Sequence, residues 1–83
     1  MKKACIELID YSKAACLVEG KKGMGRCLFI VILSDDIYAN ISSEQWLKAL
    51  KLCQHKATEL EYEVAEIRGG ALAGLPRTTG NSL

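Results

Sequence analysis

The longest unbroken apolar run in the chain spans Cys27 to Leu33 and reads CLFIVIL. β-Branched and aromatic side chains fit a pleated surface, and an uninterrupted apolar run is typical of a strand covered on both faces. The run is much too short to cross a bilayer. It therefore predicts a central strand, with further strands beside it and a helix packed over it.

Two segments before this run predict strands. Residues 3–11 predict a strand with one buried face, and residues 14–19 predict a second, shorter strand. Asp10 to Lys13 is a turn candidate because Asp and Ser side chains bond their own backbone. Gly20 to Arg26 holds three glycines and three cations. Its place between two strands predicts a flexible, solvated hairpin tip.

The segment after Ile41 carries the start signals of an amphipathic helix. Ser42 is the predicted N-cap, and Gln45 three residues later completes a capping box. Apolar side chains then recur at helical spacing at Trp46, Leu47, Leu50, Cys53, Ala57 and Leu60. Leu52 lies off this stripe, so we expect it to be exposed.

Residues 62–68 fit two interpretations. Val64 and Ile67 continue the helical face, whereas the Tyr and Val content favours a strand. We favour the strand because the sheet needs a further member in a compact domain. The fold class is then α+β: a small antiparallel or mixed sheet in the order β-β-β-α-β, with one amphipathic helix packed on one face. Residues 1–75 form the single predicted domain, and residues 76–83 a flexible, disordered tail.

Length and composition limit the class of protein. A chain of 83 residues, 49% of them apolar, can form one domain with its own core. Its formal net charge of +1 argues against a dedicated polyanion binder. Glu7 and Asp10 interrupt the apolar stretch that a secretory signal would need. We therefore expect a cytoplasmic protein whose four cysteines are reduced and mainly buried, with Cys5 or Cys16 as the exposed thiol.

No motif predicts a catalytic, metal or cofactor site. Gly25 precedes Arg26 and a strand, whereas a phosphate-binding Walker loop needs Gly-Lys-Ser/Thr and a helix. The cysteines are not spaced in pairs, as zinc ligands usually are. His55 lies on the solvent face of the predicted helix, and the neighbours Asp35 and Asp36 would point to opposite sides of a strand. We expect a non-enzyme with no cofactor and no small-molecule substrate.

The sheet offers a surface for a partner. One helix covers only one face, so the other face is a candidate interface for another protein or for a second copy in a homodimer. Sheet edges offer a further route, by addition of a strand. The acidic residues predict a negative patch that would face a basic partner; they are Glu59, Glu61, Glu63 and Glu66, of which Glu59, Glu63 and Glu66 are the expected contacts.

The leading hypothesis is a small, non-enzymatic protein-binding module that binds a cytosolic protein complex. Its size class is that of inhibitors and regulators carried by phages and mobile elements. The alternative is an accessory protein that contacts nucleic acid through the basic glycine-rich loop. In that case Lys21, Lys22 and Arg26 would meet the phosphate backbone. Neither hypothesis involves a membrane.

Overall fold

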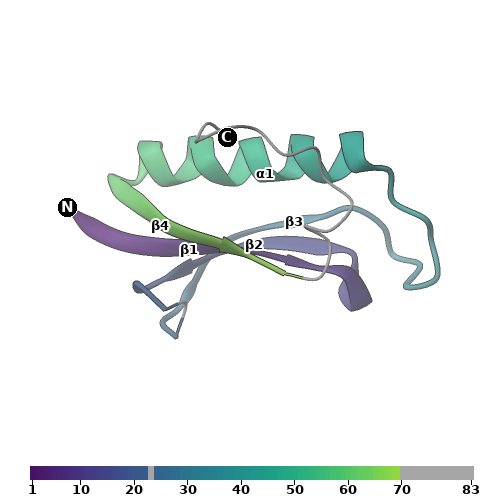
Figure 1. Cartoon of the computed structure of the whole chain (residues 1–83), viewed down its shortest axis with the longest axis horizontal. Coiled ribbons are helices and arrows are strands. Elements are labelled where there is room, and N and C mark those ends of the chain that lie inside the picture. Colours follow the sequence, from purple (N-terminus) through teal and green to yellow (C-terminus); the bar gives the residue numbers. More distant parts are fainter. Residues whose placement is uncertain (23, 70–83) are drawn as a thin grey trace.

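Among the described residues, four strands form one layer and a single helix forms a second layer above it (Figure 1). The computed structural model describes residues 1–22 and 24–69, so the predicted tail and the predicted domain end at residue 75 lie outside the described residues. The elements are β1 (Lys2–Ile9), the 3-10 turn η1 (Asp10–Ser12), β2 (Ala14–Glu19), β3 (Cys27–Ile32), α1 (Ser43–Glu59) and β4 (Tyr62–Arg68). This confirms the α+β class and the order β-β-β-α-β.

The sheet is mixed, and its strand order is β3-β2-β1-β4. Two antiparallel hairpin connections place β1, β2 and β3 next to one another. Helix α1 then carries the chain back across the sheet, and β4 pairs in parallel with the open side of β1. The prediction that the Cys27–Leu33 run forms a central strand is therefore wrong, because β3 lies at one edge and β1 and β2 are internal.

Alternate side chains of the sheet pack against the helix and form the core. Ile6, Leu8 and Leu17 are fully buried there, together with Leu50 on the helix. Burial of one such side chain contributes about 1.5–3 kcal/mol. The helix also buries Trp46 and leaves Leu52 52% exposed, as its position off the stripe predicted. The core is thus a single layer of side chains between the sheet and α1.

The helix begins with the predicted capping box. The side chain of Ser42 accepts a hydrogen bond from the backbone N–H of Gln45 at 3.2 Å. The Gln45 side chain in turn accepts from the backbone N–H of Ser42 at 3.1 Å. These two bonds satisfy donors that the first helical turn would otherwise leave without partners.

Residues 62–68 form a strand, as we favoured. The helix ends at Glu59, and Glu61 takes a left-handed conformation with φ of 65°, which turns the chain back into the sheet. Within β4, Ala65 is an extra residue that opposes no partner on β1, so it forms a bulge. Gly69 ends the strand with φ of 132°, and a Cβ there would lie 2.0 Å from the carbonyl oxygen of Leu8. Only glycine fits that position without displacing β1.

Candidate functional site

The face of the sheet opposite α1 is the candidate site. The strand registers align Arg68, Glu7, Cys16 and Ile30 across β4, β1, β2 and β3 in that order. The adjacent row aligns Glu66, Cys5, Val18 and Cys27, so the charged side chains lie mainly over β4 and the apolar ones over β2 and β3. The open face therefore has a polar half and an apolar half.

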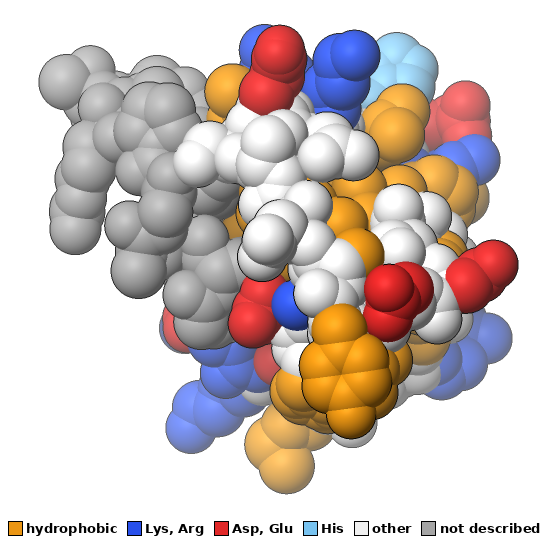
Figure 2. Space-filling view, turned by 90° about the vertical axis from the view of Figure 1, so that its right-hand side faces the viewer, with side chains coloured by type: hydrophobic (Ala, Val, Ile, Leu, Met, Phe, Trp, Pro, Cys, Tyr) orange, Lys and Arg blue, Asp and Glu red, His pale blue; other side chains and the backbone are white. Residues whose placement is uncertain are grey.

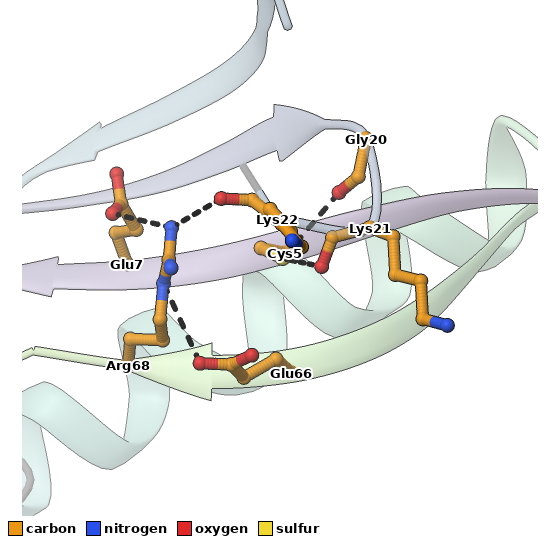
Figure 3. Close-up of polar contacts among 7 residues, drawn as sticks. All are labelled: Cys5, Glu7, Gly20, Lys21, Lys22, Glu66 and Arg68. Atoms are coloured by element: carbon orange, nitrogen blue, oxygen red, sulfur yellow. Dashed lines mark hydrogen bonds and ion pairs between the residues drawn. The ribbon is translucent and has the colours of Figure 1, made fainter. Parts of the chain in front are cut away.

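Arg68 organises the polar half (Figure 3). Its Nη2 donates to Oε2 of Glu7 at 3.2 Å and to the backbone carbonyl of Lys22 at 2.7 Å. Its Nε lies 3.6 Å from Oε2 of Glu66, which is an ion-pair distance but too long for a hydrogen bond. One guanidinium thus ties together β4, β1 and the loop between β2 and β3.

The loop between β2 and β3 folds beneath the sheet (Figure 1). The thiol of Cys5 donates to the carbonyl oxygen of Lys21 at 2.9 Å and lies 3.4 Å from that of Gly20. The N–H of Gly25 closes the loop by donating to the carbonyl oxygen of Glu19 at 2.8 Å. The loop side chains are exposed, as predicted for a solvated tip, and the loop backbone is also anchored, because Cys5 on β1 and Arg68 on β4 donate hydrogen bonds to its carbonyl oxygens.

The apolar half lies on β2 and β3. Ala14, Cys16 and Val18 are at least nine-tenths buried, although no helix or strand among the described residues covers them. Ile30 is 48% exposed and Ile32 is 63% exposed on the adjacent edge strand. Figure 2 looks at the end of the molecule near η1, where hydrophobic side chains gather on the lower surface, away from the helix.

The predicted acidic contacts do not form one patch. Glu59 lies at the end of the helix and pairs with Lys56 at 2.6 Å. Glu63 on β4 pairs with Lys3 on β1, and Glu66 pairs with Arg68. The partner hydrogen bonds hold the pKa of Glu59 and of Glu63 below the ordinary value of 4.5. Each of these charges is therefore offset within the chain.

The predicted basic contacts are also separated. Lys21 and Lys22 are exposed, and the Lys21 side chain points away from Arg68 (Figure 3). Arg26 pairs instead with Glu19 at 3.4 Å, while the hydroxyl of Tyr62 donates to the same carboxylate at 2.6 Å. The Tyr62 bond, followed by the Arg26 charge, lowers the pKa of Glu19, and this carboxylate raises the pKa of Tyr62.

The thiols differ from the prediction as well. All four are free: Cys5 and Cys16 are buried with Cys53, and Cys27 is the exposed one. Burial raises the pKa of Cys16 to about 11 and that of Cys53 to about 12. Burial also raises the pKa of Cys5, an effect that the nearby charge of Arg68 opposes. Three of the thiols are thus held in the protonated, unreactive form at neutral pH.

Two features of the described residues bear on other kinds of site. Within 1–22 and 24–69, no set of three His, Cys, Asp or Glu side chains is placed to hold a metal ion. In the same part of the chain, no helix combines the length and apolar character needed to span a membrane. The single histidine, His55, is exposed on the outer side of α1.

Comparisons of the chain with protein-family models, curated proteins and solved structures find no match. The function must therefore be inferred from the chemistry of the surface itself. Sequence reasoning did not identify Arg68 or the exposed Ile30 and Ile32 as surface determinants. Their only signal in the sequence is alternation, which places Glu66 with Arg68 on one strand face and Ile30 with Ile32 on another.

Proposed function

We propose that this chain is a non-enzymatic protein-binding module that regulates or inhibits a cytoplasmic protein complex by occupying one of its surfaces. The binding surface in this proposal is the apolar half of the open sheet face, which we call the β2–β3 strip. We define the strip by Ala14, Cys16, Val18, Ile30 and Ile32. A small domain of this kind acts by covering a partner's surface and needs no chemistry of its own.

The observation that carries this proposal is the exposure of Ile30 and Ile32. They lie opposite Cys16 and Ala14 on β2, which are only 8% and 3% exposed, so the two isoleucines are the accessible part of the strip. Each isoleucine would contribute about 1.5–3 kcal/mol if a partner buried it fully, and less for the part already covered. Exposed apolar strips next to a charged border are typical of protein interfaces. The charges of Arg68 and Glu7 supply that border.

The nucleic-acid alternative has less support. A phosphate-binding loop would need several free cations, and Arg26 is paired with Glu19. Arg68 bonds the carbonyl oxygen of Lys22 and also contacts the carboxylates of Glu7 and Glu66. Both carboxylates therefore lie near the segment that holds Lys21 and Lys22. These carboxylates would repel a phosphate backbone at close range.

The proposal is tested by affinity capture with a matched pair of variants. Ile30→Lys with Ile32→Lys places two charges on the strip, whereas Leu52→Lys places one on the outer side of the helix, where the side chain is similarly exposed. Wild type and Leu52→Lys should capture the same protein in stoichiometric amount from the source cell. The strip variant should lose it while keeping a native circular dichroism spectrum.

Two results would count against the proposal. Capture that survives the strip variant would place the interface elsewhere on the molecule. Binding that nuclease treatment and raised salt abolish, and that Lys21→Glu with Lys22→Glu removes, would favour the nucleic-acid alternative.

A further inference from the structure

The two edges of the sheet differ in how they are protected from further pairing. The β4 edge carries Glu63, Glu66 and Arg68, and it has a bulge at Ala65. Charges and bulges of this kind block the addition of another strand. The β3 edge has a bulge at Leu28, but between Phe29 and Leu33 its side chains are all apolar and its pairing with β2 is regular. This segment of the β3 edge is therefore the more open of the two edges to a further strand.

The backbone of β3 presents paired donors and acceptors to the outside. The N–H of Leu33 donates to the carbonyl oxygen of Lys13 at 2.8 Å, so Leu33 points toward β2. In an antiparallel ladder, successive residues point alternately to the two sides. Ile30 and Ile32 therefore direct their N–H and C=O groups away from β2, where no strand among the described residues pairs with them.

We propose that β3 pairs in antiparallel orientation with β3 of a second copy of this chain, about a two-fold axis that passes through Val31. In this register Ile30 of one copy lies opposite Ile32 of the other, and both exchange backbone hydrogen bonds. The axis is perpendicular to the sheet, so the two helices lie on the same side. The two four-stranded sheets become one continuous sheet.

The extent of the regular part of β3 selects this register. Leu28 is an extra residue that opposes no partner on β2, and the chain bends at Asp35. Val31 is the centre of the regular segment between these two points, so a two-fold through it pairs Ile30 with Ile32 on both sides of the axis, and each copy supplies the same apolar edge that the other presents. A shift of the axis to Ile30 would bring Ile32 opposite the bulged Leu28, and a shift to Ile32 would bring Ile30 opposite Ser34.

The pairing also accounts for the composition of the strand. An unbroken apolar run is unusual at an exposed edge and typical of an internal strand. In the pair, β3 becomes internal, and the β2–β3 strips of the two copies meet at the axis. This arrangement forms whether or not a cellular partner binds the strip.

Sedimentation of the purified full chain across a wide concentration range tests the pairing. Wild type should form a dimer. Ile32→Pro should raise the dimer dissociation constant by about tenfold or more, because it removes an outward N–H from each copy. No bond to β2 uses that N–H, so the monomer should stay folded by circular dichroism. Leu52→Lys, remote from the edge, should dimerise as wild type does.

Crosslinking tests the register without relying on a proline. In a Cys27→Ser background, which removes the exposed thiol, single cysteines replace Ile30, Val31 or Ile32. With diamide as the oxidant, Val31→Cys should form an intermolecular disulfide fastest, because its two copies face each other across about 4.5 Å between Cα atoms. Ile30→Cys and Ile32→Cys should crosslink at least about tenfold more slowly, since each lies diagonal to its own copy.

Three results would overturn the inference. They are a wild-type monomer at every concentration, a dimer that Ile32→Pro leaves unchanged, and faster crosslinking at Ile30→Cys or Ile32→Cys than at Val31→Cys. None of these measurements includes a cellular partner. Failure of the pairing is therefore distinct from failure of the proposed function.

Discussion

Arg68 joins segments that are distant in the sequence, and it shows how much of the open face depends on one side chain. Lys22 precedes it by 46 residues and Glu7 by 61. The Arg68 and Glu7 side chains are 35% and 34% exposed, so solvent weakens their interaction only partly. The hydrogen bond to the Lys22 carbonyl fixes the path of the loop. The path of the loop between β2 and β3 therefore depends on Arg68, the last residue of β4.

Arg68→Ala should lower the free energy of unfolding by about 1–2 kcal/mol, because it removes two charge-assisted hydrogen bonds from a half-buried position. Denaturant unfolding measures the loss, and amide exchange of residues 20–22 and 24–25 should accelerate. Arg26→Ala is the matched control, since that side chain is 75% exposed. Its effect should stay within about 0.5 kcal/mol. Equal effects for the two variants would refute the role we assign to Arg68.

Thiol labelling should separate Cys27 from the other cysteines. In the native protein, one of the four thiols should react rapidly with an aromatic disulfide reagent at mildly alkaline pH. Burial protects the other three and raises their pKa values, so they should react only on the timescale of opening. Cys27→Ser should abolish the rapid phase. A rapid phase that persists in this variant would show that a buried thiol is accessible.

At the scale of elements, local patterns predicted most of the secondary structure. The capping box at Ser42, the helical stripe and the alternation in β1 depend on near neighbours, so they can be seen in the sequence. The position of β3 could not be seen there. Alternation of apolar residues shows which face of a strand is buried, but it does not show which strands are its neighbours. The strand order was set by the helical crossover through α1, which places β4 beside β1 and leaves β3 at the other edge. The Lys22–Arg68 contact and the exposure of Cys27 depend on the same long-range pairing.

Ser42→Ala should lower the free energy of unfolding by about 1 kcal/mol, because it leaves a helix N-terminal donor without its side-chain acceptor. Thermal unfolding followed by helix circular dichroism provides the measurement. Ser42→Asp keeps an acceptor at the same place and should restore most of the stability. Should Ser42→Asp behave like Ser42→Ala, the cap would not be the cause of the loss.

At the scale of the whole molecule, contacts made by carboxylate side chains join β1, β2 and β4. Glu19 accepts from Tyr62 across the width of β1, and Glu63 pairs with Lys3. These contacts lie at the same end of the sheet, where β1 begins and β4 starts. The stability of that end of the sheet is therefore expected to depend on the charges of Glu19 and Glu63.

Acid should therefore destabilise the fold. Glu19, Glu59 and Glu63 have pKa values below 4.5 in the folded state, so their stabilising contribution is complete above that pH. It is lost as the pH falls through the lowered folded values, and the melting temperature should drop between about pH 5 and pH 3. Tyr62→Phe removes the largest cause of the Glu19 shift and should flatten this dependence. A melting temperature that is constant or rises on acidification would contradict the assignment.

The parallel pairing of β1 with β4 has a consequence for synthesis on the ribosome. Lys3 and Glu63 are 60 residues apart. β1 is therefore synthesised early, and almost all of the described chain must follow before β4, its second neighbour, emerges. The β1–β2–β3 meander can form during that interval, whereas closure by β4 must follow release of its residues from the exit tunnel. Until then, the nascent chain has an open edge at β1 as well as at β3. Pairing with the charged and bulged β4 thus closes the β1 edge late, after the rest of the sheet has formed.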